Sequence, residues 1–541
     1  MVLYGNPNSL VGITLEIRAM GPVPVTIGTG IVAIIGESNR GPVTPTGLRS
    51  VSQIKTLYDS GDLKEGGELA FNQGAPNVYL GRVMGAGYAT ATATLTDSTG
   101  TTIGVVDAMS PGNWGNGLIF KIEDGDYYGT DVEIFSGDGT EGPYALDRDD
   151  LVADAANYVK VNNVVKTIVY SAVGLIAGTV YCNQANGSLT FFAGEGPTVS
   201  DQVRVSIKFK SRKLTLYDGE YSYVFNNIRS LEDMQAKIAE SALIVFTPSA
   251  NKTHLPKTYT PTALSGGLEG ATPTTDDWET ALNAMSEVVT PTTVVLTSYE
   301  VAGDSYDLVP ILDGWLMYMA NKFRPCLGFI PCKMNETKAN VMDLCAGYNN
   351  RLLSIVANAW DADPTTKQNI AVARAGKEAA CALGESAARS YNSMNGLNGL
   401  LQIHSDEDVD VLSRSGADVI ILKRGIRPYI GISTATDWQF MRTVDNRTIN
   451  WVILAIKYIT DQFYHERRTK VVLTSLKASL ASVFEEQIEL ENIRAYALSV
   501  SAHAIDTGRV DIDIKMENIG HIERFRVLMQ VGVMPGGGFT V

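Results

Sequence analysis

The sequence predicts an α/β core (a mixed sheet with flanking helices), an inserted all-β domain, and a C-terminal helix pair followed by a β-sheet. Strand and helix periodicities alternate in residues 22–88 and again in residues 264–424. Residues 89–248, between them, are rich in Thr, Gly, Asp, Tyr and Val and carry many turn signals. Residues 425–520 contain two amphipathic helical stretches and then strands that alternate apolar and polar residues.

Composition limits the classes of protein that this chain can belong to. At 541 residues it is too long for one ordinary core, so about two to four domains are expected. Its 45% hydrophobic and 19% charged residues predict packed cores and argue against extensive disorder. The net charge of −15 disfavours nucleic-acid binding, which needs clustered Lys and Arg. An acidic surface instead suits solubility at high copy number or a basic partner.

The sequence predicts a cytoplasmic protein with no direct membrane insertion. Residues 1–7 lack the basic region and apolar run of a signal peptide. The most apolar helical stretch, Ile449 to Ile459, falls well short of the roughly 20 residues that a bilayer requires. The odd number of cysteines and their spacing predict reduced, buried thiols at Cys182, Cys326, Cys332, Cys345 and Cys381.

The predicted core elements follow the chain in a regular order. In the first segment they are a strand over 25–35, a helix over 51–58 and a strand over 77–83. After residue 264 they are a helix from near Asp276, a strand over 293–296, a helix over 306–322, a strand over 326–330, and further helices to Ser390. This alternation is typical of an α/β core.

The inserted region reads as short strands separated by tight turns. Asn-Gly and Asp-Gly pairs at 116, 124, 186 and 218 are hairpin signals. Residues 158–170 have the composition of a strand, and residues 150–210 read as a further insertion nested inside the first. We therefore expect an all-β insertion in 89–248.

The C-terminal region is predicted to end in a helix pair and a hairpin. A strand over 427–433 is followed by helices near 448–465 and 474–491. Residues 496–502 then form a strand that can pair with residues 510–516 through the Thr507-Gly508 turn. A lone hairpin is marginal in water, so further strands from other copies would make a stable sheet.

Three stretches near the ends of the chain alternate apolar and polar residues with a period of two: 11–17, 509–516 and 525–531. An unpaired terminal strand with one apolar face is an aggregation hazard unless a neighbour pairs with it. We therefore predict exchange arms at 1–21 and 521–541; the alternative is that all three strands fold back on their own molecule. The predicted exchange residues are Val11, Ile13, Leu15, Ile17, Val510, Ile512, Ile514, Phe525, Val527, Met529 and Val531.

No motif in the sequence predicts a catalytic, cofactor-binding or metal-binding site. Gly28-Thr-Gly30 lacks a following helix start, and Ala375-Gly-Lys-Glu378 lacks the rest of a phosphate loop. Gly384 to Ala388 is predicted to lie inside an Ala-rich helix and so is no nucleophile elbow. The acidic run Asp406 to Asp410 lacks the glycine and distal glutamate of a calcium loop and reads as a solvated loop or helix start.

Several blocks, in the same order along the chain, carry a resemblance to contractile tail sheath proteins. Ser110-Pro-Gly-Asn-Trp-Gly-Asn116 resembles the turn that opens the first inserted domain of that family. The other blocks are Pro22 to Pro42, Asn77 to Val83, Leu264 to Gly270, Gly508 to Ile514 and Ile522 to Val527. The chain departs from the family in residues 357–399, which lack a Pro-Pro-Ser-Gly stretch, and in residues 150–210, which have no counterpart.

The resemblance implies a structural subunit that is not an enzyme and needs no cofactor. Such a subunit forms a helical sheath of stacked rings around an inner tail tube and contracts to drive the tube through a host envelope. It implies baseplate and tail terminator proteins as further partners, a place in the virion tail, and assembly in the host cytoplasm. The alternatives are the sheath of a secretion system or phage-tail-like particle, and an intracellular α/β enzyme with a β-rich lid.

A local concentration of basic residues lies between the two C-terminal helices. The resemblance implies that this region faces the inner tube, so a basic patch there could match an acidic tube surface. The alternative is an ordinary solvated basic loop. The candidate tube contacts are Arg467, Arg468, Lys470 and Lys477.

Overall fold

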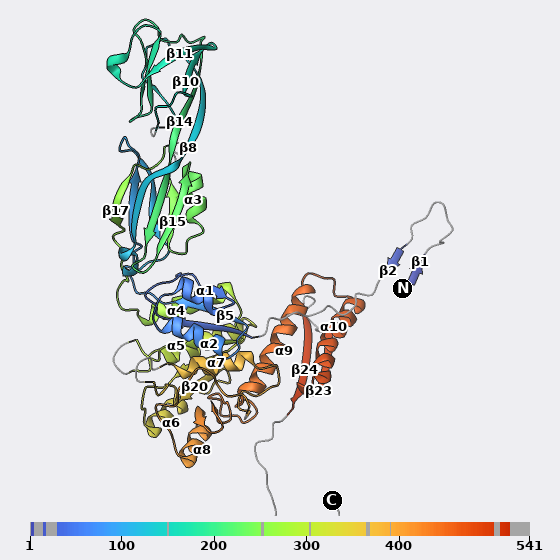
Figure 1. The fold of residues 1–541 in the computed structure, drawn as a ribbon. Helices are drawn as coiled ribbons and strands as arrows, with labels where there is room; N and C mark the ends of the chain where they lie inside the picture. The colour runs from blue at the N-terminus through green and yellow to red at the C-terminus, as the bar shows by residue number, and fades with distance from the viewer. Residues whose placement is uncertain are drawn as a thin grey trace, which may run out of the picture.

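The computed structural model describes residues 2–4, 15–17, 30–148, 151–249, 254–301, 305–363, 368–389, 391–502 and 509–519. An α/β core lies at the centre of the chain, an elongated β-insertion extends from one end of it, and a unit of two helices and a hairpin lies beside it (Figure 1). Within these residues, no helix is long and apolar enough to span a membrane.

The core is an eight-stranded sheet in the order β22-β21-β20-β19-β18-β3-β5-β4. The central strands are parallel, whereas β4 and β22 are antiparallel edge strands. The strands are β3 Ile31–Gly36, β4 Thr46–Leu48, β5 Asn77–Arg82, β18 Thr293–Leu296, β19 Leu327–Pro331, β20 Leu353–Ala357, β21 Ala417–Leu422 and β22 Ile426–Pro428.

Helices cover both faces of this sheet, which explains why its central strands are apolar throughout. Successive residues of β3 point to opposite faces: Ile34 lies against α2 and α7, whereas Ile35 lies against Met285 of α4. The core helices are α1 Val51–Leu57, α2 Asp62–Asn72, α4 Thr275–Val288, α5 Leu308–Asn321, α6 Lys338–Ala346, α7 Ile370–Ala380 and α8 Asp406–Arg414.

The β-insertion consists of two lobes that share two long antiparallel strands, β8 Ile119–Ser136 and β14 Gln202–Tyr217. The proximal lobe adds β6 Thr92–Thr96, β7 Thr102–Ala108, η1 Asn113–Gly117, β15 Ser222–Ile228, α3 Leu231–Ile238, β16 Ile244–Pro248 and β17 Tyr259–Ala263. The distal lobe adds β9 Tyr144–Ala145, β10 Tyr158–Val161, β11 Val164–Val169, η2 Ala172–Gly174, β12 Thr179–Asn183 and β13 Ser188–Phe191. Each lobe has its own buried apolar cluster.

The joint between core and insertion brings together four of the sequence blocks described above. The buried Arg82 side chain donates to the carbonyls of Ser38 (2.7 Å), Gly41 (3.0 Å) and Pro111 (2.9 Å). In addition, the Asn116 side-chain amide and the Gly267 backbone exchange two hydrogen bonds of 2.9 Å. These contacts tie the Ser110 turn to the end of β5 and to the return segment.

The C-terminal unit contains α9 Thr443–Gln462, α10 Lys470–Glu489, β23 Ile493–Ala502 and β24 Val510–Asn518. At the other end of the chain, β1 Val2–Tyr4 and β2 Leu15–Ile17 form an antiparallel pair. The predicted helix pair and the predicted hairpin of 496–502 with 510–516 are both confirmed.

Several local predictions were wrong. The strands β20 and β21 were not predicted, and β22 ends at Pro428, well before residue 433. The predicted strand over 158–170 is a hairpin, because Asn162 and Asn163 both adopt positive φ angles of 48° and 68° and reverse the chain. Residues 384–388 are not helical, since α7 ends at Ala380.

Candidate assembly interface

The two C-terminal helices pack against each other through narrow apolar stripes. Their turn contains His465 with a φ of 66°, and the Thr469 hydroxyl caps α10 by accepting the Val472 N–H. The helices bury a small cluster made of Ala455, Ile459, Leu476, Leu480 and Val483. One side of the helix pair is not used in this helix–helix contact, and a β-sheet can pack against it.

The hairpin β23–β24 covers that side with its apolar face. Because side chains alternate across a strand, Val510, Ile512 and Ile514 all lie partly buried against the helices. Their register partners Ala502, Val500 and Leu498 lie on the neighbouring strand. Tyr496 also stacks on Phe484 of α10 with ring centroids 4.9 Å apart. The opposite face carries polar side chains such as Asp513 and Lys515.

This sheet has only two strands in the described part of the chain, so neither outer edge has a strand partner there. Each edge presents a row of backbone N–H and C=O groups that can pair with another strand. A two-stranded sheet is marginal by itself. Here α9 and α10 support it as a platform whose two outer edges have no strand partner among the described residues.

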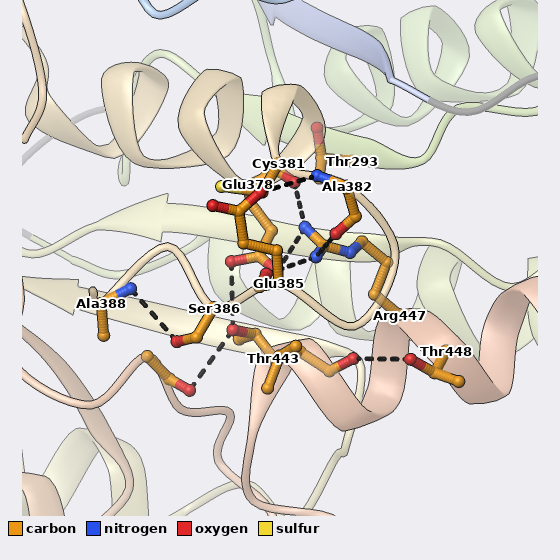
Figure 2. A network of polar contacts seen from close by, with 12 residues as sticks. Thr293, Glu378, Cys381, Ala382, Glu385, Ser386, Ala388, Thr443, Arg447 and Thr448 are labelled. Atoms are coloured by element: carbon orange, nitrogen blue, oxygen red, sulfur yellow. Dashed lines mark hydrogen bonds and ion pairs between the residues drawn. The ribbon is translucent and has the colours of Figure 1, made fainter. Parts of the chain in front are cut away.

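A buried network of charged groups attaches α9 to the core (Figure 2). Arg447 of α9 forms an ion pair of 3.0 Å with Glu378 of α7. Its guanidinium also donates to the carbonyl oxygens of Glu378, Ala382 and Glu385, the last two at 2.6 Å. The segment after α7 thus wraps around one α9 side chain.

A second buried arginine extends this network into the core sheet. Arg374 bonds Glu378 at 2.6 Å and Asp418 of β21 at 2.8 Å, and all three side chains are fully buried. Burial would raise the pKa of Glu378, but Arg374 and Arg447 hold that pKa below its usual range. Burial raises the pKa of Asp418 above its usual range despite Arg374. Removing one partner would leave a buried charge uncompensated, at a cost of about 3–5 kcal/mol.

The predicted exchange residues fall into three groups in the structure. Val510, Ile512 and Ile514 lie in β24, as described above. Leu15 and Ile17 lie in β2, which pairs with β1 of the same chain. Val11, Ile13, Phe525, Val527, Met529 and Val531 lie outside the described residues, so their exchange with a neighbour stays a prediction.

The predicted tube contacts lie on and beside the turn between α9 and α10. Arg467, Lys470 and Lys477 are exposed. Arg468 is partly buried and donates to the Arg509 carbonyl at 3.0 Å, so this side chain holds the start of β24 against the turn. The four basic residues therefore include three exposed cations and one with a structural contact.

Two groups of residues at this interface were not foreseen from the sequence. Tyr464 and Val471, 69% and 76% exposed, place apolar surface among the cations of the turn. Arg374 and Arg447 carry the network that orients α9. An exposed apolar residue and a buried arginine leave no distinct pattern in a sequence, because each depends on the packing of distant segments.

The burial of the cysteine thiols determines whether any of them can act as a nucleophile. Four of the five thiols are buried, as predicted, and Cys381 is partly buried. Burial raises the pKa of Cys326 and of Cys345 to about 12 and that of Cys381 to about 11. These thiols therefore stay protonated near neutral pH and are weak nucleophiles.

Comparison with known proteins finds similar folds among solved structures and no match by sequence. No protein-family model and no curated protein matches the chain. The sheath tail protein of Desulfitobacterium hafniense superposes with a TM-score of 0.55 at 12% identity, covering 94% of this chain and 100% of that one. The sheath tail protein Lin1278 of Listeria innocua gives a TM-score of 0.55 at 12% identity, covering 91% and 96%.

The helical sheath of the anti-feeding prophage in its contracted state gives a TM-score of 0.50 at 10% identity, covering 97% of this chain and 99% of that one. In each of these three comparisons nearly the whole of both chains is matched. The chain therefore has the fold of contractile tail sheath proteins.

Proposed function

We propose that this chain is the structural subunit of a contractile tail sheath, which polymerises helically around an inner tail tube and contracts to drive the tube through a host envelope. Its further partners are baseplate and tail terminator proteins. It has no catalytic role and needs no cofactor, and it works in a virion tail assembled in the host cytoplasm. The fold shared with sheath tail proteins supports this proposal.

The observation that carries the proposal is the two-stranded platform of β23 and β24. Its apolar face is already packed on α9 and α10, and its outer edges have no partner among the described strands. One added strand contributes about five or six backbone hydrogen bonds of net ~0.5–1.5 kcal/mol each. Burying an apolar side chain of that strand adds ~1.5–3 kcal/mol before ordering costs. Terminal strands of neighbouring copies, residues 11–17 and 525–531, have the required alternation.

Truncation tests this function. Deleting residues 1–20, or ending the chain after Gly520, should leave a folded subunit that no longer forms cylinders in negative-stain images. Circular dichroism of each truncated chain checks that the core is intact. Long cylinders formed by either truncated chain would exclude strand exchange as the link between subunits.

The sheath of a phage-tail-like particle or secretion system is the nearest alternative, since the anti-feeding prophage sheath shares the fold. Purifying the assembled particle from its native source distinguishes these: a DNA-filled head on the sheath indicates a phage. Discrete monomers whose thermal midpoint rises with a small-molecule ligand would instead favour an α/β enzyme with a β-rich lid.

A further inference from the structure

One exposed face of the distal lobe carries a row of side chains that crosses four neighbouring strands. The register places Ile134 of β8 beside Arg204 of β14, Arg204 beside Lys160 of β10, and Lys160 beside Val165 of β11. We call these four residues the cationic row. Neighbouring strands lie about 4.8 Å apart, so the row is roughly 14 Å long. β10 and β11 lie at the end of the insertion farthest from the core, where the long strands β8 and β14 extend to meet them (Figure 1).

The two cations at the centre of this row oppose each other directly. Like charges in register across antiparallel strands destabilise a sheet. Neither Lys160 nor Arg204 forms an ion pair with any residue in the described ranges. Lys160 instead lies 4.7 Å from the centroid of the Tyr158 ring. The repulsion between Lys160 and Arg204 is therefore not compensated by an ion pair within the described residues.

Among the described residues, the strand positions next to the two cations on this face carry no acid. One adjoining row is formed by Val132, Ser206 and Tyr158, and the other begins with the Ser136 and Gln202 pair. Exposed apolar side chains flank the two cations: Ile134 and Val165, at the ends of the row, are 57% and 61% exposed, and Val132 in the adjoining row is 48% exposed. A pair of cations with apolar borders suits a carboxylate-bearing surface that has apolar contacts of its own.

We propose that the cationic row binds an acidic surface on the distal lobe or core of a second copy of this chain. The chain supplies such surface, because its 59 acidic residues exceed its 44 basic residues. A row meeting a different surface on the next copy is a heterologous contact, the kind that builds open helical polymers. The contact is weak alone and acts once the arms hold neighbouring copies close together. The inference rests on the proposed sheath function.

A single substitution tests two effects separately: the destabilisation of the monomer by the like charges, and the contribution of the row to polymerisation. In Lys160→Glu, a carboxylate faces Arg204 across the strands, so the thermal midpoint of the monomer should rise. The same variant should raise the critical concentration for polymerisation roughly fivefold at low salt, the loss expected for about two exposed ion pairs. The increase should disappear at high salt, where exposed charges are screened.

Lys257→Glu is the matched control, because Lys257 also lies over a tyrosine two residues away, Tyr259, at 5.5 Å. This variant makes the same change in charge in the proximal lobe and should polymerise like the wild type. If Lys160→Glu and Lys160→Glu/Arg204→Glu polymerise like the wild type at low salt, the proposal is wrong. If wild-type monomers bind soluble polyglutamate while polymerisation of the variants is unchanged, the partner is an external polyanion and the second copy is excluded. A wild-type chain that forms no polymer at all refutes the sheath function itself.

Discussion

Arg82 shows how much one side chain contributes to the joint between core and insertion. Its guanidinium donates to four carbonyls, those of Ser38, Asn39, Gly41 and Pro111. The planar fork reaches several acceptors at once, which a lysine ammonium on its flexible stem cannot reproduce. Arg40 lies over Trp114 at 4.8 Å in the same joint. The Ser110 turn and the loop that follows β3 are thus held together by two arginines.

We therefore expect Arg82→Lys to destabilise the protein by about 3 kcal/mol, since several buried carbonyls lose their donor. Chemical denaturation, followed by circular dichroism, measures the loss. Arg494→Lys is the control, because Arg494 is 73% exposed in its ion pair with Glu517 and should change stability little. An unchanged stability of Arg82→Lys would show that the joint is held by other contacts.

We expect Glu133, on β8, to make the stability of the insertion depend on pH. Burial, together with Asp147 and Asp131, raises its pKa from an ordinary 4.5 to about 7. The folded state therefore binds a proton that the unfolded state has released between these two values. Stability should fall as the pH rises through this window, by about 1 kcal/mol once the partial exposure of the side chain is allowed for.

Calorimetric melting at pH 5 and pH 8 tests this effect. The thermal midpoint of the insertion should be higher at pH 5 than at pH 8, and Glu133→Gln should reduce that difference while retaining an acceptor for the Asp147 N–H. A pH dependence equal in wild type and variant would assign it to other groups.

At the scale of elements, the C-terminal unit combines a rigid attachment with an exposed tip. Arg447 and Arg374 fix α9 to the core through buried ion pairs. At its other end, the α9–α10 turn exposes cations together with Tyr464 and Val471. An element held at one end and exposed at the other is suited to carrying a contact surface at a fixed distance from the core.

We predict that changing Arg467, Lys470 and Lys477 together to Glu reduces co-assembly on purified inner tubes at low salt. The expected defect is salt-sensitive, because exposed ion pairs are screened. Sheath polymers formed without tubes should be unaffected. Arg468→Glu should behave differently and loosen the hairpin, since Arg468 holds the Arg509 carbonyl. Unchanged tube binding by the triple variant at low salt would dismiss the contact.

At the scale of the whole molecule, the two lobes of the insertion form a continuous structure because β8 and β14 pass through both. Removing the predicted nested insertion, residues 150–210, would divide β14 and leave the C-terminal half of β8 without its partner. The register offers a cleaner boundary, since Gly129 and Phe209 are direct partners, and Phe209 belongs to the proximal cluster.

Replacing residues 130–208 with Asn-Gly should therefore join the strands by a two-residue turn and leave the rest of the chain folded. The thermal midpoint of the α/β core should change by no more than a few degrees, because the distal lobe has a separate apolar cluster. Limited proteolysis checks the result. Rapid cleavage within the proximal lobe would show that the two lobes fold as one unit.

The sequence alone determined the elements whose periodicity is local. The strand over 293–296 was predicted with the bounds of β18, and the hairpin of β23 and β24 followed from alternation and a turn signal. The α/β class followed in the same way. Two core strands, β20 and β21, were not predicted from the sequence because they are buried on both faces. A short apolar run without alternation does not distinguish a strand from a helix.

Only the tertiary structure decided where these elements meet. Glu378, Arg374 and Asp418 lie within one buried network although up to 44 residues separate them, and Arg82 reaches a turn 29 residues away. Lys160 opposes Arg204 solely because β10 pairs with β14 in one particular register. Periodicity depends on neighbours along the chain, whereas burial, charge pairing and register depend on which distant segments pack together. That difference is why the sequence indicated the class of fold, and the folded chain was needed to locate its joints and surfaces.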